Sequence, residues 1–390
     1  MTQDGYEKVG ASATKEDVKD AIKSQSTGLY PGAFCKVVED VAGDPAYCSV
    51  IHADGAGTKS TIAYIDYKEH GDASVFKGIA QDSAIMNLDD MACVGATNDF
   101  VFSNTIGRNA HRVNKEILTN IIDGYQEVVD NLKEHGCRIV MAGGETADVG
   151  DLVETVIVDS TVFVRLPRKD VIDASNIKPG NVIVGLASFG KAVYEKAYNS
   201  GIGSNGFSRA RHLLLKHEYA EKYPETFSAT IPDDLVFQGP YALDDRLPNA
   251  KGMTVGEALL SPTRTYLPVM NELLGKHRKD ISGVIHCSGG GLTKSLHFGR
   301  GLHYVKNDLF EAPPIFQAIL DTGNISLQEA CKVFNMGIRY EIYTTPKTAQ
   351  AVIEIAKNFG IDAKVIGEVL PKRTERNSLT IKTRGAELTY

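Results

Sequence analysis

The sequence predicts an α/β (α+β) protein of two domains. β-like apolar runs alternate with helical segments, and 390 residues are enough for two cores of ordinary size. The pattern is interrupted once, over residues 165–180, which are charged and contain two prolines and a glycine. We therefore expect an N-terminal domain over residues 1–168, a second domain over 169–370 and a polar C-terminal tail over 371–390.

Composition narrows the classes of function. Hydrophobic residues make up 43% and charged residues 23% of the chain, as in ordinary globular enzymes, and the net charge is −7. An acidic chain without a Lys/Arg run is a poor partner for polymeric nucleic acid. No stretch has the length of a membrane span, no signal peptide opens the sequence, and the six cysteines form no Cys-x-x-Cys pair. We expect a cytoplasmic protein with reduced thiols and no membrane partner.

The first candidate site follows a predicted strand over residues 47–53. That strand delivers Asp54-Gly55-Ala56-Gly57-Thr58-Lys59 into a tight turn, and residues 60–64 after it are β-like. Glycines let backbone N–H groups approach an anion closely, and the lysine supplies a compact positive charge. The carboxylate tolerates a phosphate only with a cation between them, and Mg²⁺ prefers carboxylate and phosphate oxygens. Taken alone, the segment fits a metal–nucleotide site and a solvated hairpin turn equally well.

Residues 73–95 are predicted to form a helix that is apolar over most of its surface. Three acids lie within it, namely Asp82, Asp89 and Asp90. Positions seven apart nearly align on a helix, so Asp82 and Asp89 share a face. Buried carboxylates repel one another and lose hydration, and a bound cation removes both costs. We therefore favour metal binding over capping or surface contacts at a helix edge.

A third candidate follows the next predicted elements. Residues 100–105 are β-like, and apolar spacings of three and four then predict a helix that ends at Gly136. The predicted strand 137–142 delivers Gly143-Gly144-Glu145-Thr146. Ligands collect outside the carboxyl ends of strands in open α/β sheets, so we expect Asp54, Glu145 and the acidic helix to form a single cluster. Taken alone, Glu145 is better explained as a turn or helix-start carboxylate.

The second domain repeats the α/β pattern. Predicted strands cover residues 182–187, 283–287 and 365–370. The pair Thr345-Pro346 combines a favourable N-cap with a favourable first helical residue, and it predicts a helix that runs to Gly360.

Several well-known site motifs are absent from this sequence or lack the structural context that they require. Residues 201–206 fit G-x-G-x-x-G, but no strand precedes them, so we interpret them as a loop whose N–H groups and amide can face a phosphate. Neither 54–59 nor 289–294 matches the P-loop pattern, because threonine replaces the glycine before lysine. His52 and His286 end strands, where hydrogen-bonded core histidines are more common than ligands. No His/Cys cluster has zinc spacing.

Several segments occur in an order that indicates one family. They are 54–59 (family pattern Asp-Gly-x-Gly-Thr-Lys), 86–96 (Met-x-x-Asn-Asp…Gly-Ala), 143–147 (Gly-Gly-Glu-Thr-Ala), 204–207 (Ser-Asn-Gly-Tyr), 262–264 (Pro-Thr-Arg), 286–291 (His-x-x-Gly-Gly-Gly) and 334–337 (Phe-Asn-x-Gly). With these motifs the chain, from Tyr6 to about Leu370, resembles the aminoimidazole ribonucleotide synthetases, also called phosphoribosylformylglycinamidine cyclo-ligases. Thiamine-monophosphate kinase and selenophosphate synthetase share their superfamily.

The resemblance implies a fold, an assembly and a reaction. The fold is an N-terminal mixed sheet with helices and a C-terminal mixed sheet flanked by helices, and the assembly is a homodimer in which the N-terminal sheets pair. The reaction is the ATP-dependent ring closure of formylglycinamidine ribonucleotide to aminoimidazole ribonucleotide in de novo purine biosynthesis. ATP phosphorylates the amide oxygen, and the amidine nitrogen then attacks and expels phosphate. Such a transfer depends on positioning and charge neutralisation more than on a covalent nucleophile.

The resemblance also implies site residues, with ATP and Mg²⁺ as cofactors. The catalytic positions are Lys59, which lies on phosphate, Asp90 and Glu145. The metal positions are Asp54, Asp90 and Glu145, with Asp82 and Asp89 as further candidates. The ATP-binding positions are Asp54, Gly55, Gly57, Thr58, Lys59, Gly143 and Gly144, and the substrate-side positions are Ser204, Asn205, Gly206 and His286.

Departures from the family pattern concentrate on the substrate side. Asp89 replaces an Asn, Ser261 replaces a Glu, and Ile338-Arg339-Tyr340 replaces Val-Gly-Met. The ATP-side motifs are better preserved. Two alternatives therefore stay open: an ATP-dependent small-molecule kinase of the same superfamily, and a non-catalytic nucleotide-binding paralogue.

Overall fold

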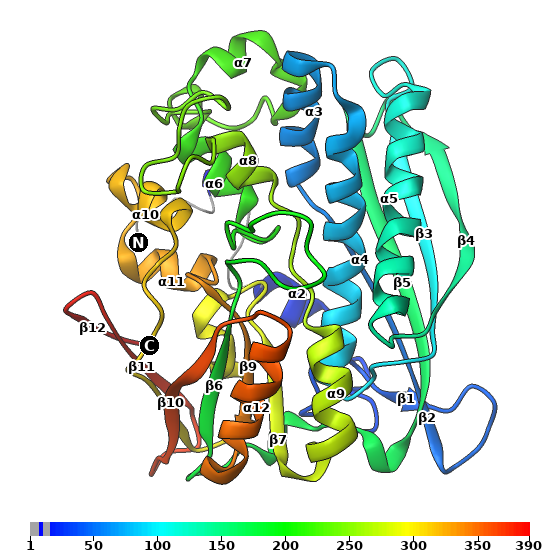
Figure 1. Ribbon diagram of the computed structural model, residues 1–390, viewed down its shortest axis with the longest axis vertical. Helices are drawn as coiled ribbons and strands as arrows, with labels where there is room; N and C mark the ends of the chain where they lie inside the picture. Colours follow the sequence, from blue (N-terminus) through cyan, green and yellow to red (C-terminus); the bar gives the residue numbers. More distant parts are fainter. Residues whose placement is uncertain (1–7, 11–15) are drawn as a thin grey trace.

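The computed structural model describes residues 8–10 and 16–390. They form two sheets, each with its own helices, the N-terminal one on the right of Figure 1 and the C-terminal one on the left. β5 (Val156–Pro167) is the last strand of the first sheet in chain order, and β6 (Val182–Ala187) is the first strand of the second. The chain therefore passes from one sheet to the other within the segment that was predicted to separate two domains.

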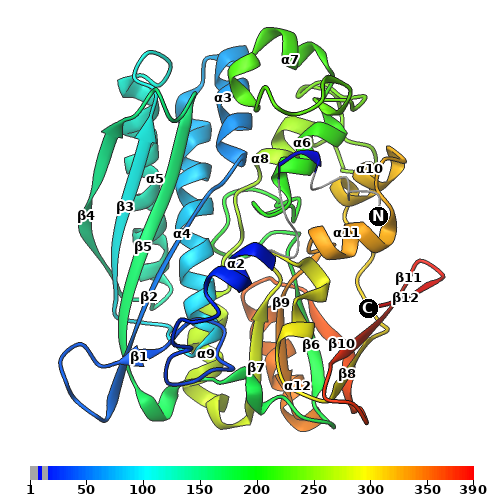
Figure 2. The same ribbon diagram turned by 180° about the vertical axis from the view of Figure 1, so that it is seen from behind.

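The N-terminal sheet has the strand order β1-β2-β5-β3-β4. It is mixed, as expected, because β3 and β4 are parallel while the other neighbours are antiparallel. The remaining strands are β1 (Val38–Glu39), β2 (Tyr47–Gly55), β3 (Phe100–Arg108) and β4 (Ile139–Asp148). Its helices are α3 (Lys59–His70), η1 (Ala73–Val75), α4 (Phe76–Cys93) and α5 (Lys115–Glu134). Figures 1 and 2 show these helices on one side of the sheet.

The two long helices of this domain were predicted correctly. α4 is buried over nearly its whole length, because it packs on β2 and β5 on one side and on elements of the second domain on the other. A helix that is apolar all round requires such cover. α5 has Asn114 as its N-cap, and the Asn114 side chain accepts from the Ile117 N–H. The chain turns away after the helix at Gly136, which has a φ of 80°.

Two expectations about this domain were wrong. Residues 60–64 were expected to be β-like, but they belong to α3, where Ile62, Ala63 and Tyr64 are buried. Their β-branched residues favour strands only weakly, and packing decides in favour of the helix. The segment 143–145 was expected after a strand end, but it lies inside β4, which continues in parallel register with β3 as far as Asp148.

The outer face of the N-terminal sheet carries an exposed row of apolar side chains. Pairing registers place Ile51, Phe163, Val101 and Val140 in one row across β2, β5, β3 and β4. Ile51 is 64% exposed, Val140 55% and Val101 41%. No described helix covers this face in either view (Figures 1 and 2). An exposed apolar row of this kind is typical of an interaction surface.

The C-terminal sheet has the strand order β12-β11-β8-β10-β6-β9-β7 and is mixed, since β11 runs parallel to β8 and the other neighbours are antiparallel. Its further strands are β7 (Ile281–His286), β8 (Leu302–Lys306), β9 (Ile338–Thr344), β10 (Ala363–Pro371), β11 (Ser378–Thr383) and β12 (Ala386–Thr389). The predicted polar tail thus packs as a hairpin that extends this sheet.

The remaining helices and short 3-10 turns complete the fold. The predicted start of α12 is confirmed, because the Thr345 side chain accepts from the Thr348 N–H. The helices are α2 (Glu16–Ala21), α6 (Phe207–Leu214), α7 (Glu218–Lys222), α8 (Val255–Leu260), α9 (Leu267–His277), α10 (Pro314–Asp321), α11 (Leu327–Val333) and α12 (Pro346–Asn358). The 3-10 turns are η2 (Arg168–Asp170), η3 (Ala174–Asn176), η4 (Pro224–Thr226), η5 (Asp233–Leu235), η6 (Arg278–Asp280) and η7 (Gly291–His297).

Two sequence-level observations can be compared with the described residues. Within residues 8–10 and 16–390, none of the helices combines the length and apolar character needed to cross a bilayer. All six cysteines are buried and unpaired with one another.

Candidate functional site

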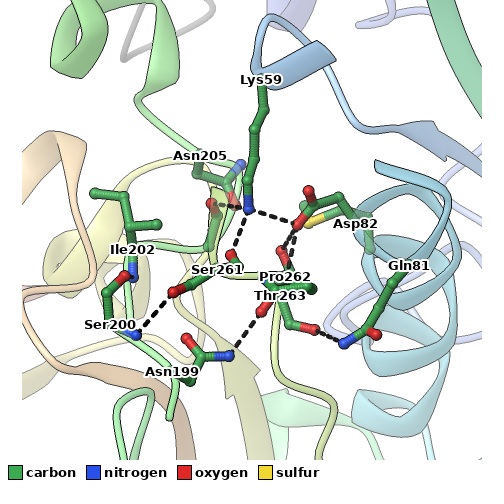
Figure 3. A network of polar contacts seen from close by, with 12 residues as sticks. Lys59, Gln81, Asp82, Asn199, Ser200, Ile202, Asn205, Ser261, Pro262 and Thr263 are labelled. Carbon is green, nitrogen blue, oxygen red and sulfur yellow. Dashed lines mark hydrogen bonds and ion pairs between the residues drawn. The ribbon is translucent and has the colours of Figure 1, made fainter. Parts of the chain in front are cut away.

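The ammonium of Lys59 lies at the centre of a network that joins the two domains (Figure 3). Its Nζ donates to Asp82 Oδ1 of α4 at 3.0 Å, to the Gly203 carbonyl at 3.2 Å and to the Ser261 carbonyl at 2.6 Å. Asp82 Oδ1 also accepts from the N–H and hydroxyl of Thr263, at 2.8 and 2.6 Å. One lysine and one aspartate of the first domain thus hold two loops of the second.

Burial shapes the electrostatics of this pair. Desolvation lowers the pKa of Lys59, although the Asp82 carboxylate opposes the shift, and desolvation raises the pKa of Asp82 against the effect of Lys59. The three N–H bonds of the ammonium all have protein acceptors. The assignment of Lys59 to a phosphate therefore stays a prediction, and a phosphate oxygen would have to replace one of these acceptors.

Asp89 of α4 is bound by the segment that follows this network. Its carboxylate accepts from the Thr265 hydroxyl at 2.7 Å and from the Tyr266 N–H at 3.1 Å. Burial raises the pKa of Asp89 to about 7, and these hydrogen bonds limit the rise. Tyr340 of β9 donates to the Asp89 carbonyl at 2.9 Å and stacks on Tyr266 with ring centroids 4.9 Å apart.

Asp90 of α4 lies between two histidines from different domains. Its Oδ1 accepts from His286 Nδ1 at 2.6 Å, and its Oδ2 lies 3.5 Å from His52 Nε2. Burial and the Arg339 guanidinium lower the pKa of His286 to about 4, so its ring is neutral near pH 7. Burial alone would raise the pKa of Asp90, but His286, His52 and Lys294 hold it below its ordinary value. Asp90 is therefore an ionised carboxylate with a fixed orientation.

The predicted single cluster of Asp54, Glu145 and the acidic helix does not form within one chain. Asp54 pairs with Ser160, whose side chain bonds to α4, so Asp54 lies on the helix-covered face of the sheet. Glu145 pairs with Thr105, which in turn pairs with Asp159 on the outer face. The prediction failed because Glu145 is an internal residue of edge strand β4, where the strand pleat and not a strand end decides its direction.

The carboxylates of the first domain are possible ligands of Mg²⁺. No group of three His, Cys, Asp or Glu residues in the described part of the chain is arranged to hold a metal ion. Asp54 and Asp159 lie close enough for the Asp54 charge to raise the pKa of Asp159, after the larger effect of burial. Mg²⁺ commonly takes one or two carboxylates and completes its shell with phosphate oxygens and water. Asp54, on the helix-covered face at the end of β2, fits that mode as a single protein carboxylate, whereas Asp159 of β5 points to the opposite face.

The predicted ATP-binding positions occupy two separate places. Thr58 lies in the turn between β2 and α3, where its hydroxyl is 3.3 Å from the Ser208 hydroxyl of α6. Gly57 in the same turn has a φ of 62° and open space where a Cβ would stand. Gly143 and Gly144 lie in β4, at the far edge of the sheet from β2. One chain brings the β2–α3 turn to the second domain but does not bring Gly143 and Gly144 to it.

The substrate-side positions lie around a buried arginine. Asn205 Oδ1 accepts from Arg339 Nη2 at 3.2 Å, and Gly206 is the N-cap of α6 with a φ of 75°. Ser204 and Asn205 are half-buried, whereas His286 is fully buried. The structure therefore brings these positions to the same domain boundary as Lys59.

Sequence reasoning missed the partners of the α4 acids. Thr263, Thr265 and the carbonyls of Gly203 and Ser261 are more than 100 residues away from α4 or from Lys59 along the chain. No local pattern indicates such contacts. The recurrence of Pro262-Thr263-Arg264 as a family motif was the one signal in this segment.

Solved structures with a similar fold include a PurL of Thermotoga maritima complexed with FGAR. It has a TM-score of 0.55 and 15% sequence identity, over 98% of this chain and 53% of that chain. The same PurL complexed with ADP has a TM-score of 0.54 over 99% of this chain. This chain thus spans about half the length of those proteins. A HypE–HypF complex has a TM-score of 0.53 at 16% identity, over 97% of this chain and 99% of that chain.

Comparisons with the sequences of known proteins are more specific about the family than the similar folds are. A phosphoribosylformylglycinamidine cyclo-ligase of Methanococcus maripaludis strain C7 is 30% identical over 360 residues, which cover 92% of this chain and 86% of the relative. The protein of the same name from Methanobrevibacter smithii is 28% identical over 98% of this chain and 96% of the relative. The family profile of the AIR synthase related protein N-terminal domain matches residues 35–164, and that of the C-terminal domain matches 178–377. The chain belongs to the AIR synthase related family.

Proposed function

We propose that this protein is an ATP-dependent cyclo-ligase that closes the imidazole ring of formylglycinamidine ribonucleotide in de novo purine biosynthesis. The observation that carries the proposal is the convergence of family-motif residues from both domains on one helix. Lys59, Thr263 and His286 contact the acids of α4, each from a different motif segment. Relatives that carry the cyclo-ligase name align with nearly the whole chain, which supports the same assignment.

The β2–α3 turn is the proposed position for the nucleotide phosphates. Asp54 supplies a carboxylate for Mg²⁺, and Gly57 and Thr58 supply backbone N–H groups to the phosphates. The Gly55 N–H donates to Asp54 Oδ1 at 2.8 Å and so orients that carboxylate. Bound ATP and Mg²⁺ would supply the phosphoryl group and neutralise its charge. Asp90, fixed between His52 and His286, and Glu145 are the other proposed metal positions.

We further propose that two copies of the chain pair through the outer face of the N-terminal sheet. The row of exposed apolar side chains described above gives such a contact its driving force. Glu145, Gly143 and Gly144 belong to the edge strand of this sheet, and Glu145 points to the outer face. In a dimer these residues would lie beside the partner copy, which explains how Asp54 and Glu145 can serve one function from opposite faces.

His286 is proposed to contact the substrate directly. Its Nδ1–H donates to Asp90, which fixes the tautomer and leaves Nε2 as an acceptor. His286 Nε2 is buried and has no hydrogen-bond partner among the described residues. A neutral imidazole acceptor in this position can orient the amidine N–H of the substrate and receive its proton as the ring closes.

The test combines purified protein with Mg-ATP and formylglycinamidine ribonucleotide and measures phosphate release and aminoimidazole formation together. Coupled appearance of both products is the expected result. His286→Gln keeps an amide donor for Asp90, and we expect it to lower turnover by about 100-fold while Mg-ATP affinity stays unchanged. Mg-ATP binding without either product would contradict the cyclo-ligase assignment and would favour a non-catalytic paralogue or a kinase with another acceptor.

A further inference from the structure

Arg339 is a fully buried cation whose hydrogen-bonding capacity is mostly unused. It stands on β9, and its side chain is 0% exposed. Nη2 donates to Asn205 Oδ1 at 3.2 Å and lies 3.0 Å from the Met86 sulfur. Nε and Nη1 have no hydrogen-bond partner within the described residues. A guanidinium has five N–H donors, so three of those on Arg339 are buried and unpaired.

A second buried arginine shows what a purely structural guanidinium looks like in this protein. Arg264 is 1% exposed, and all three of its nitrogens are bonded. Nε and Nη2 bind the Glu195 carboxylate, and Nη1 binds the Ala187 and Phe189 carbonyls at 3.0 and 2.6 Å. Unpaired buried donors are costly, and most are explained by a ligand or an ordered water. Arg339 therefore differs from Arg264 in lacking acceptors, not in burial.

The loop that covers Arg339 also presents unpaired donors. Nη1 lies so close to Gly203 that a Cβ on this residue would overlap it. The backbone N–H groups of residues 204–208 have no acceptor among the described residues, and α6 begins at Phe207 without a side-chain cap. Helix N-termini favour anions, and a guanidinium aimed at the same loop adds a full positive charge. Ser204 and Asn205 are only half-buried, so this loop reaches the protein surface.

The nearby carboxylates all bind other groups and not the Arg339 guanidinium. Asp82 is matched by Lys59 at 3.0 Å, Asp90 lies between two histidines, and Asp89 is bound by the Thr265–Tyr266 segment. None of the three accepts a hydrogen bond from Arg339. The asparagine of the loop, beside the Lys59 ammonium in Figure 3, is the only oxygen on the guanidinium within the described part of the chain.

We propose that Arg339 and the N–H groups of residues 204–208 form an oxyanion site that binds the phosphate monoester of the ribonucleotide substrate. A phosphate has three terminal oxygens, each able to accept from the guanidinium and from several backbone N–H groups at once. The identity of the ribonucleotide rests on the proposed function, but the anion site itself does not. Arg339 is thus a specificity-determining residue for a substrate that carries a phosphate.

The experiment compares affinities by calorimetry for three probes, namely inorganic phosphate, formylglycinamidine ribonucleotide and its dephosphorylated nucleoside. In the unchanged protein the ribonucleotide should bind about 10- to 100-fold more tightly than the nucleoside. Inorganic phosphate should compete with the ribonucleotide and leave nucleoside binding unchanged. Arg339→Gln should remove most of the difference between ribonucleotide and nucleoside, and Arg339→Lys should restore part of it. Arg376→Gln, at an exposed arginine, is the matched control and should change nothing.

The outcomes separate this inference from the proposed function. Phosphate binding that Arg339→Gln loses would support the anion site even if no ring closure is found. Equal phosphate affinity in both proteins, or a loss of Mg-ATP affinity alone, would overturn it. If Arg339→Gln does not fold, the competition experiment on the unchanged protein decides, because absence of competition between inorganic phosphate and the ribonucleotide would also overturn it.

Discussion

Two regions of this protein depart from the rule that charged side chains face water and apolar side chains are buried. One is the domain boundary along α4, and the other is the outer face of the N-terminal sheet. Along α4, charged groups that ordinarily face water are buried, among them Lys59, Asp82 and Arg339. On the outer face, Ile51 and Val140, which are ordinarily buried, are more than half exposed. The acids of α4 find their partners within the chain, in both domains, whereas the apolar row has no cover among the described residues. Each exception therefore indicates a contact, one within the chain and one outside it.

Removing the Lys59 charge should have the largest effect. Lys59→Met leaves Asp82 buried and unpaired, and we expect a loss of about 3–5 kcal/mol in the free energy of unfolding, measured in urea. Lys306→Met is the matched control, because Lys306 and Glu341 form a second fully buried pair at 2.5 Å that lies outside the α4 network.

Repaired variants separate stability from activity at these two pairs. Lys59→Met with Asp82→Leu, and Lys306→Met with Glu341→Leu, should each regain much of the lost stability. We expect only the Lys306/Glu341 double variant to retain ring-closing activity. An active Lys59/Asp82 double variant would show that this network is only a structural connection between the domains.

Asp89→Asn should have the next largest effect, and one that depends on pH. Burial raises the Asp89 pKa to about 7 from an ordinary value of 3.8, so its contribution to stability is fully present below about 4 and is lost as the pH rises through 7. An asparagine does not titrate. In metal-free buffer we therefore expect the variant to gain up to about 4 kcal/mol relative to the unchanged protein at pH 8, and little at pH 4. Urea unfolding at both pH values measures this, and a gain that is the same at both would contradict the raised pKa.

Val101→Lys tests the exposed apolar row. If two copies pair through the outer face, this change should raise the dimer dissociation constant by about 100-fold, measured by sedimentation velocity over a concentration series. Ile122 on α5 is 51% exposed on another surface, and Ile122→Lys is the matched control. A monomeric unchanged protein would remove the outer face from the proposed assembly.

The smallest expected effect is at a helix end remote from both regions. Thr345→Ala removes the side-chain cap of α12 and should cost about 1 kcal/mol of unfolding free energy without changing turnover. The same urea series measures it. A change in activity would mean that α12 is coupled to the site.

Local patterns determined much of the fold. The apolar periodicity of residues 73–95, the Gly136 stop and the Thr345 cap act within one or two helical turns, so the sequence alone was enough for α4, α5 and α12. Predictions from local patterns were wrong where contacts between distant segments decide the structure. Residues 60–64 have strand-like composition, and only the packing of Ile62 and Tyr64 against their neighbours makes them helical.

The same distinction between local and long-range interactions applies to the candidate site. The sequence alone was enough to name the candidate residues, since Asp54, Lys59, Asp90, Glu145 and His286 lie in family-motif segments, and it predicted a bound metal cation beside the acids of α4. Only the tertiary structure decided which groups of the chain those acids bind and that Glu145 points away from Asp54. Charge pairing and strand direction depend on groups far apart in the chain. Lys59 with Ser261 and Asp90 with His286 are examples, and these residues meet only when the second domain packs on the first.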